Sequence, residues 1–401
     1  MQLGIDRLIR DPSLRADLAG RRVAVLGHPA SVTSSLEHTL DALAALPDVH
    51  LSAAFGPQHG MRGDVQDNMI ETEDTHDPRH GIPVFSLYGT VRRPTDAMLD
   101  TFDVLLVDLQ DVGTRIYTYF TTLLYVMEAA ARTGKEVWVL DRPNPAGRPI
   151  EGTALIDGHQ SFVGASTVPM RHGLTLGEAA HFFAAEHGLS LAFRVIEMEG
   201  YDPAVAPGFG WPRLAWVNPS PNAASLNMAR CFPGTVLLEG TTLSEGRGTT
   251  VPLEVIGAPD IDRDAVFARM RELAPAWLEG CDLRPCAWLP TFHKHQGKLT
   301  HGLQIHTDGP RYDHDRFKPY RLISLFLKAL RQLQPDYPIW RDHPYEYTSG
   351  RLPIDVIDGG PLLRQWVDDP GATVAEREEL LAREEHAWSV RRAPYLLYGN
   401  D

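Results

Sequence analysis

The first half of the chain alternates short apolar runs with segments whose apolar residues recur at helical spacing. Buried strands are predicted at residues 22–26, 50–55, 83–88, 103–109 and 136–140, and helices at residues 36–46, 116–133 and 175–187. The run at 103–109 is continuous and β-branched, as strands covered on both faces are. Strand–helix–strand repetition implies right-handed crossovers, so we predict an α/β fold with a mainly parallel sheet and helices on both faces.

The second half has a different pattern. Residues 219–257 are rich in Gly, Pro, Ser and Thr, which predicts loops and short strands. Helices are predicted at residues 261–273, 321–333, 361–367 and 374–387, and strands of an antiparallel element at 288–292 and 302–306. We therefore expect an N-terminal domain of residues 1–227 and a smaller α+β domain of residues 228–401.

Composition excludes several classes of protein. The 401 residues are 43% hydrophobic and 22% charged, which is typical of a globular domain rather than a disordered chain. No run of about 18 apolar residues occurs, so we expect no membrane association. A net charge of −14 argues against a nucleic-acid partner. Three Cys exclude a disulfide framework, and the start MQLGIDRLIR lacks the apolar core of a signal peptide, so we expect a cytoplasmic protein.

Polar residues gather directly after three of the predicted strands. In an open parallel sheet, ligands bind beyond the carboxyl ends of the strands, which meet at one edge. These strand ends supply carboxylates, guanidinium groups, an imidazole and amides. The residues are Gln58, His59, Arg62, Asp64, Asp108, Gln110, Asp111, Arg115, Asp141, Arg142 and Asn144. The coincidence of three such segments predicts a binding site for a polar ligand.

Familiar cofactor and nucleophile motifs do not occur. The turn after the first strand contains Pro29 and is not G-x-G-x-x-G, so no dinucleotide cofactor is expected. A phosphate loop and a G-x-S-x-G elbow are also missing from the sequence. Carboxylate or histidine chemistry remains, and we expect no cofactor.

Further polar clusters lie outside the strand ends. Arg171 and His172 precede a predicted helix, and Asn222 lies in a Pro-rich loop. The Gly-rich loop at 239–250 carries Glu239, Glu245 and Arg247. This loop could hold a sugar by its hydroxyls or supply an acid, or Glu245 and Arg247 could form an internal ion pair.

A histidine-rich segment leaves open the possibility of a metal site. His293, His295, His301 and His306 lie close together, with Cys281 and Cys286 nearby. Alternating His residues on a strand share one face, as metal ligands do. The C-x₄-C spacing is not a usual zinc pair, and two Lys add repelling charge.

The order of these motifs resembles the exo-β-N-acetylmuramidase family. The motifs are F-G-P-x-H-G-x-R-G, S-L-Y-G, D-x-Q-D-V-G-x-R-x-Y-T-Y, L-D-R-P-N-P-x-G, R-H-G-x-T, P-S-P-N, E-G-T-x-L-S-E-G-R-G-T, P-T-F-x-K and the segment Pro344–Tyr347, together spanning nearly the whole chain. The resemblance implies a Rossmann-like N-terminal domain, a smaller C-terminal domain and an active-site cleft between them. It also implies hydrolysis that releases N-acetylmuramic acid from the non-reducing end of a peptidoglycan-derived sugar.

The sequence departs from the family in one motif and at its start. The family form of the first motif is P-E-H-G, whereas Gln58 follows Pro57 here. A Gln side chain cannot act as a general acid or base. If that carboxylate is the acid of the family, this protein has moved the role to another residue, changed the reaction or lost the activity, and Glu71 is near enough in sequence to replace it. Many relatives look exported, so a cytoplasmic version would act on imported muropeptide fragments or on another sugar.

We therefore predict a glycoside hydrolase that uses two carboxyl groups. The catalytic candidates are Glu71, His59, Asp108, Asp111 and Glu245, with Glu71 or His59 favoured as proton donor. A cation, ideally a bidentate Arg, is expected to bind the lactyl carboxylate of the sugar, and Arg62 and Arg171 are favoured over Arg115, Arg142 and Arg247. Two alternatives stay open. One is a sugar-binding or regulatory protein on the same fold that has lost the catalytic acid because position 58 is Gln, and the other is a metal-dependent hydrolase that uses the histidine cluster.

Overall fold

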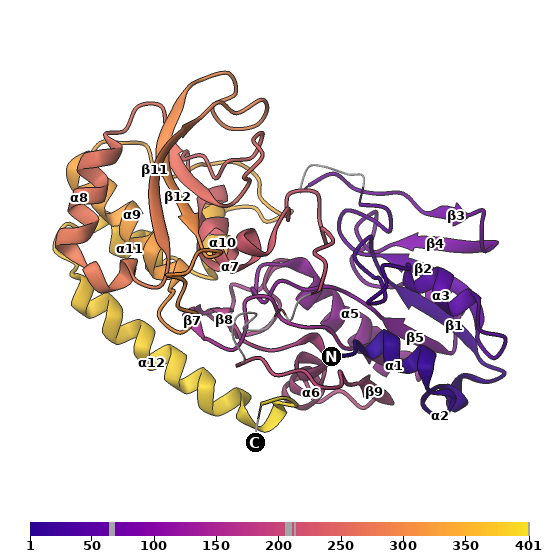
Figure 1. Cartoon of the computed structure of the whole chain (residues 1–401). Coiled ribbons are helices and arrows are strands. Elements are labelled where there is room, and N and C mark those ends of the chain that lie inside the picture. Colours follow the sequence, from indigo (N-terminus) through magenta and orange to yellow (C-terminus); the bar gives the residue numbers. More distant parts are fainter. Residues whose placement is uncertain (64–68, 205–210, 212–213, 400–401) are drawn as a thin grey trace.

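The N-terminal half folds around a mostly parallel sheet, as predicted (Figure 1). The computed structural model describes residues 1–63, 69–204, 211 and 214–399. The strand order is β3-β4-β2-β1-β5-β6-β9, and the pairing of β3 with β4 is antiparallel whereas the other pairs are parallel. The strands are β1 Arg22–Leu26, β2 His50–Gly56, β3 Thr75–Asp77, β4 Ile82–Ser86, β5 Val104–Val107, β6 Glu136–Leu140 and β9 Phe193–Ile196.

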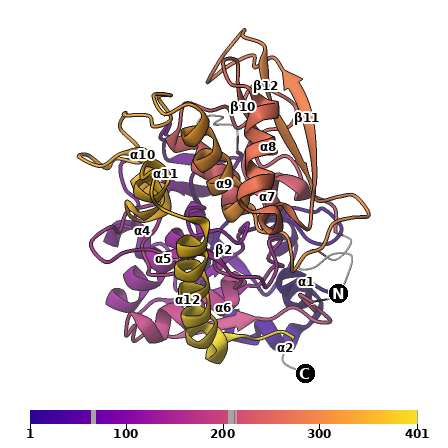
Figure 2. The ribbon, with the colours of Figure 1, turned by 90° about the vertical axis from the view of Figure 1, so that its left-hand side faces the viewer.

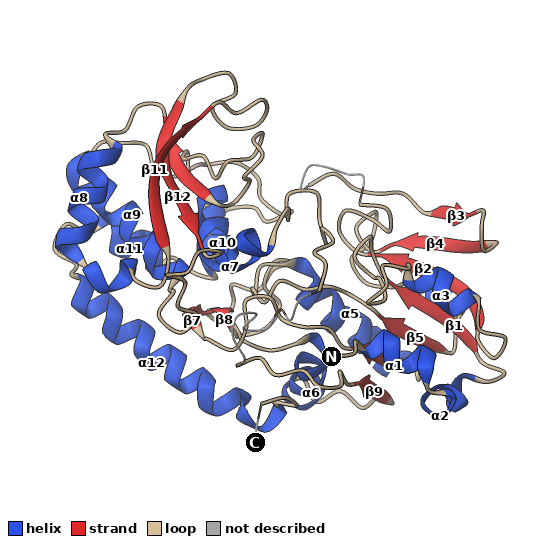
Figure 3. Cartoon of the chain, in the orientation of Figure 1, coloured by secondary structure: helices blue, strands red, loops and turns tan. Residues whose placement is uncertain are grey.

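Helices cover both faces of this sheet (Figure 3). Alternate residues along each strand enter two separate cores: Leu26 and Val107 pack with α5 and α6, whereas Val25 and Leu106 pack with α1 and α3. Apolar residues on both faces explain why the strands read as continuous apolar runs. The helices are α1 Gly4–Arg10, α2 Pro12–Arg15, α3 Thr39–Ala44, α4 Asp96–Leu99, α5 Thr118–Thr133 and α6 Leu176–Glu186.

The local signals for helix ends are confirmed in two places. Gly134 follows α5 in the left-handed conformation, with φ 68°. Thr175 caps α6 and forms a capping box with Glu178. The helix predicted at 36–46 is shorter, because His38 accepts a hydrogen bond from the Leu40 amide as N-cap and the helix begins at Thr39.

The second half contains an antiparallel sheet of order β10-β12-β11 packed against helices. Its strands are β10 Val255–Ala258, β11 Asp282–Trp288 and β12 Thr300–His306. A separate antiparallel pair, β7 Glu151–Ala154 and β8 Pro169–Arg171, belongs to the first half of the chain. The helices of the second half are α7 Leu226–Thr235, α8 Arg263–Leu273, α9 Pro319–Leu333, α10 Pro353–Asp358, α11 Leu362–Asp368 and α12 Val374–Arg392. Short 3₁₀ helices lie at Ala16–Leu18, Val236–Gly240, Pro275–Leu278 and Ala393–Tyr395.

Two predictions about the second half were wrong. Residues 219–257 contain the buried helix α7, although Pro233 lies inside it. The strand predicted at 288–292 lies earlier in the chain, as β11. Pro285 hides this strand in the sequence, and it is tolerated because β11 is at the edge of its sheet.

The two halves form lobes that share a continuous core. Helix α12 leaves the C-terminal lobe and runs down beside α6 of the N-terminal lobe (Figure 2), and it contacts β7 and β8. Trp388 of α12 packs against Phe182 of α6, with ring centroids 5.0 Å apart. Across the described ranges, no helix is long and apolar enough to span a bilayer.

Candidate active site

A buried pocket lies where the two lobes meet. The loop after β2 and the start of α5 supply Gln58, His59, Tyr117 and Thr118 from the N-terminal lobe. The loop before α7 and two segments of the C-terminal lobe complete the wall with Ser220, Asn222, Glu239, Arg247, Tyr345 and Glu346. The pocket is therefore assembled only when both lobes are folded and joined.

Glu346 is held on one side of this pocket by two hydrogen bonds. The Gln58 Nε2 amide donates to Glu346 Oε1 at 3.3 Å, and the Tyr88 hydroxyl donates to Glu346 Oε2 at 2.9 Å. The Thr118 hydroxyl donates to Gln58 Oε1 at 2.8 Å, which fixes which end of the amide faces Glu346. The sequence departure at position 58 thus places an amide, not a second carboxyl group, against a buried glutamate.

The environment of Glu346 favours its neutral form. The side chain is only 4% exposed. Burial raises the pKa of Glu346 to about 7; the nearby Glu239 also raises it, whereas the hydrogen bonds from Tyr88 and Gln58 oppose the shift. A carboxyl group with this pKa is half protonated near neutral pH, as a general acid requires.

Glu239 also lines the pocket and is paired with a cation. Arg247 NH2 lies 2.6 Å from Glu239 Oε1, and the Tyr345 hydroxyl donates to Glu239 Oε2 at 2.8 Å. Charge-assisted contacts of this kind are shorter and stronger than neutral hydrogen bonds. The pocket therefore contains two carboxyl groups in opposite environments, the arrangement by which glycosidases divide the acid and base roles.

Glu245 lies behind Arg247 and is fully buried. Its Oε1 is 3.3 Å from Arg247 Nε, and its Oε2 is 2.5 Å from Lys294 Nζ. Although burial alone would favour the neutral form, Lys294, His293 and Arg247 hold the pKa of Glu245 below its usual range. Glu245 and Arg247 therefore form the internal ion pair that was one of the two possibilities for this loop. The same Arg247 side chain also pairs with Glu239, so Glu245 helps to hold it in place.

Strained backbone is concentrated around this pocket. His59 has φ 69°, Glu346 has φ 44°, Tyr347 has φ 60° and His293 has φ 66°. A residue other than glycine in this region costs about 1–3 kcal/mol, and such residues cluster at functional sites. His59 and Glu346 line the pocket, and Tyr347 directly follows Glu346. His293 contacts Glu245.

The predicted residues at the ends of β5 and β6 lie in internal networks. Asp108 accepts from Arg142 Nε at 2.5 Å and is also bonded by Thr39. Asp141 accepts from Thr175 and Tyr398, and burial raises its pKa to about 6 although these hydrogen bonds oppose the shift.

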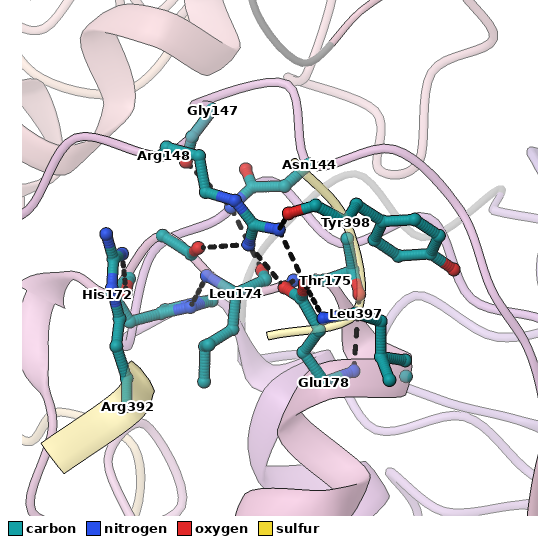
Figure 4. Close-up of polar contacts among 12 residues, drawn as sticks. Asn144, Gly147, Arg148, His172, Leu174, Thr175, Glu178, Arg392, Leu397 and Tyr398 are labelled. Atoms are coloured by element: carbon teal, nitrogen blue, oxygen red, sulfur yellow. Dashed lines mark hydrogen bonds and ion pairs between the residues drawn. The ribbon is translucent and has the colours of Figure 1, made fainter. Parts of the chain in front are cut away.

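The C-terminal segment covers the β6 end of the sheet (Figure 4). Asn144 donates to the Leu174 carbonyl. Arg148 pairs with Glu178, and the Leu397 amide donates to the same carboxylate. These contacts fix the strand ends without facing the pocket.

Several other candidates donate to backbone carbonyls inside the fold. Gln110 bonds the Pro143 carbonyl, Arg115 bonds the carbonyls of Thr153 and Val168, and Arg171 bonds those of Ala146 and Phe317. Both arginines are buried and lie outside the pocket wall.

Asp111 faces His172, with Oδ2 and Nε2 3.8 Å apart, and burial raises the pKa of Asp111 to about 7.

Glu71, Arg62 and the histidine cluster lie apart from the pocket wall. Glu71 pairs with Arg92 at 3.2 Å, and Arg62 lines a neighbouring hollow with Glu71. Asp64 is outside the described residues. His301 and His306 are on β12 but His293 and His295 lie in a turn, and in the described part of the chain no group of three or more His, Cys, Asp or Glu is placed to hold a metal ion.

Sequence reasoning missed six polar residues of the site. These residues were not candidates, although each lies within a motif that carried the family resemblance: Tyr88, Tyr117, Thr118, Ser220, Tyr345 and Glu346. Glu346 is the most informative of them, because it is a buried glutamate between two tyrosines. An acidic residue flanked by aromatic residues in a shared motif was the available signal.

Two family models and one named relative match nearly the whole chain, and all three carry the same family name. The family model described as exo-beta-N-acetylmuramidase NamZ, N-terminal, matches residues 23–227, and the corresponding C-terminal model matches residues 230–398. The peptidoglycan beta-N-acetylmuramidase NamZ of Bacillus subtilis (strain 168) is 37% identical over 399 residues, covering 99% of this chain and 91% of that protein.

Two crystal structures have the same architecture. Both are DUF1343 family proteins of Bacteroides fragilis NCTC 9343. One superposes with a TM-score of 0.86 at 29% identity, covering 99% of this chain and 98% of that one. The other superposes with a TM-score of 0.77 at 26% identity, covering 100% of this chain and 99% of that one.

Proposed function

Because this chain belongs to the exo-β-N-acetylmuramidase NamZ family and is a glycoside hydrolase, we propose that Glu346 and Glu239 carry out its reaction. The reaction is release of N-acetylmuramic acid from the non-reducing end of peptidoglycan fragments. The observation that carries the assignment is the hydrogen-bonded set of Gln58, Tyr88 and Glu346 in the pocket between the lobes.

Glu346 is the proton donor in this proposal. Its raised pKa leaves a proton available near neutral pH, and that proton is transferred to the glycosidic oxygen as the bond to the leaving sugar breaks. Gln58 supports this role by orienting the carboxyl group through an amide N–H hydrogen bond, and the amide itself is neither an acid nor a base near neutral pH. The acid role thus lies on the C-terminal lobe rather than at position 58.

Glu239 is the second carboxyl group. Paired with Arg247 and hydrogen-bonded by Tyr345, it acts at the anomeric carbon, either as a nucleophile or by activating a water molecule. Arg247 lines the same pocket and is the arginine from the predicted set that we assign to the lactyl carboxylate.

The test compares leaving groups. Glu346→Gln and the wild-type protein are given the disaccharide N-acetylmuramyl-β-1,4-N-acetylglucosamine and N-acetylmuramyl fluoride. Fluoride leaves without being protonated, so loss of a general acid spares it. We expect kcat/KM for the disaccharide to fall by about 10²–10⁴-fold in Glu346→Gln, and kcat/KM for the fluoride to fall far less.

The matched control is Glu279→Gln, an exposed glutamate paired with Arg316 far from the pocket, which should leave both substrates unaffected. Full disaccharide activity in Glu346→Gln would contradict the assignment. Tight N-acetylmuramic acid binding by a wild-type protein without turnover would favour a sugar-binding protein, and loss of turnover on adding a chelator would favour a metal-dependent hydrolase. The anomer of the first product, followed by proton NMR, distinguishes retention from inversion.

The cellular setting stays part of the proposal. We propose a role in recycling of peptidoglycan fragments in the cytoplasm, as expected from the sequence. Fractionation of the native host with an antibody to this chain tests the location, and recovery with exported proteins would contradict it.

A further inference from the structure

An exposed aromatic side chain lies directly beside the proposed proton donor. Tyr347 follows Glu346 in the chain and is 60% exposed, and Met69 and Ile70 are 37% and 52% exposed. We call Tyr347, Arg92, Met69 and Ile70 the Tyr347 platform. Most large apolar side chains of the molecule are buried, so a surface with three exposed members at a pocket between lobes indicates a binding role.

The platform is held in place rather than loosely exposed. The Arg92 guanidinium carbon lies 4.0 Å from the centre of the Tyr88 ring and 4.6 Å from that of Tyr347. The Glu346 amide donates to Met69 Sδ at 3.4 Å. Tyr347 keeps a left-handed backbone at φ 60°. Arg92 therefore contacts one ring on each side, and Tyr347, with its strained backbone and its contact to Arg92, presents its ring in one orientation, which reduces the entropy lost on binding.

The position of the platform defines which part of the substrate it meets. Tyr88 donates to Glu346 through its hydroxyl, and its ring lies 6.4 Å from that of Tyr347. The Glu346 carboxyl group must reach the oxygen of the leaving sugar. The group attached to that oxygen extends out of the pocket from the sugar that fills it. Tyr347 directly follows Glu346 in the chain, is exposed, and is not among the residues that line the pocket, so its ring is available next to the proton donor for this part of the substrate.

We propose that the Tyr347 platform binds the sugar on the leaving side of the scissile bond. This inference rests on the proposed function. The ligand class is an N-acetylhexosamine whose apolar C–H face stacks on the Tyr347 ring. Arg92 and the half-exposed Glu71 that pairs with it supply a donor and an acceptor for the hydroxyl and acetamido groups at the edge of that sugar.

The experiment compares substrates with and without a leaving sugar. Tyr347→Ala, Tyr347→Phe and the wild-type protein are given the disaccharide and N-acetylmuramyl fluoride. We expect Tyr347→Ala to lower kcat/KM for the disaccharide about tenfold and to change that for the fluoride less than about twofold. Tyr347→Phe keeps the ring and should retain both activities.

Leu36→Ala serves as the control, because Leu36 is 55% exposed on the N-terminal lobe outside the pocket wall. An equal loss on both substrates in Tyr347→Ala would overturn the proposal, since Tyr347 would then act by holding Glu346. An unchanged disaccharide rate would overturn it as well. A wild-type protein that cleaves neither substrate would contradict the proposed function itself, and this outcome is distinct from turnover without a Tyr347 effect.

Discussion

A single amide sets the chemistry of Glu346. Gln58 accepts from Thr118 and donates to Glu346, so it orients a carboxyl group and adds no charge. A glutamate at position 58, as in the P-E-H-G form of the motif, would place two carboxyl groups in contact. Like charges at that distance cannot both ionise freely, and the pair would share a proton. Gln58 therefore gives Glu346 a neutral hydrogen-bond partner at this position instead of a second carboxyl group.

Replacing this amide should move the pH dependence of activity. A proton donor is active when protonated, so we expect wild-type kcat/KM to fall as pH rises through about 7, the raised pKa of Glu346. In Gln58→Glu the added negative charge raises the pKa of the pair further, and the alkaline limb should move upward by roughly one pH unit or more. The measurement is kcat/KM for the disaccharide between about pH 5 and pH 9.

The control for this shift is Gln160→Glu, which changes the same side chain at an exposed turn. Its alkaline limb should coincide with that of the wild-type protein. An alkaline limb that stays in place in Gln58→Glu would show that Glu346 is not the group being titrated.

The first turn of α6 both caps the helix and makes tertiary contacts, through the same Glu178 side chain. Glu178 closes the capping box with Thr175, and the same carboxylate accepts two hydrogen bonds from Arg148, at 2.5 and 2.6 Å. The Leu397 amide also donates to it (Figure 4). A local helix signal thus joins the strand ends of the sheet to the C-terminal segment.

The capping boxes at the starts of α6 and α12 should differ in their contribution to stability. Glu178 is fully buried, so Glu178→Ala leaves Arg148 without its partner and should lower the free energy of unfolding by about 3–5 kcal/mol. Glu376→Ala removes the same motif at the exposed start of α12, where no buried charge is left without a partner, and should lower the free energy of unfolding much less. Urea unfolding followed by circular dichroism measures both, and equal losses would refute the tertiary role of Glu178.

The two lobes are joined by a charge network around Arg321 of α9. Arg321 contacts Glu378 and Glu385 of α12 at 2.8 and 2.5 Å, and Glu151 of β7 lies 3.7 Å away. Arg321 and Glu151 are both buried. Because Gln58 and Glu346 come from different lobes, this joint helps to keep the pocket assembled. The division into domains at residue 228 stays a prediction.

Removing the cation from this joint should destabilise the whole molecule. Arg321→Met keeps the apolar stem but leaves Glu151 buried without its charge partner, and we expect a loss of about 3–5 kcal/mol. Arg331 is also on α9 and forms a more exposed ion pair with Asp368 of α11. Arg331→Met breaks this pair and should lower the free energy of unfolding by about 0–1 kcal/mol. Thermal unfolding monitored by circular dichroism compares them, and a similar melting temperature for both variants would argue against the network as a joint.

Much of the fold followed from local patterns. The strands β1 and β6 begin and end where the apolar runs do, and the end of α5 at Gly134 and the cap of α6 at Thr175 lie where their signals placed them. Helix α7 and strand β11 were missed because Pro233 and Pro285 suggest breaks in elements that tertiary packing and an edge position tolerate.

The sequence alone determined the alternation of elements, and with it the α/β class, since periodicity depends only on neighbouring residues. It also identified Glu239, Glu245 and Arg247 as a charged group, because they lie in one short loop. Only the tertiary structure decided that Glu346 meets Gln58 across 288 positions of sequence, and that Asp108 and Arg171 are used inside the fold. The physical reason is that burial and the distance between charges decide protonation, and both arise from how the two lobes pack.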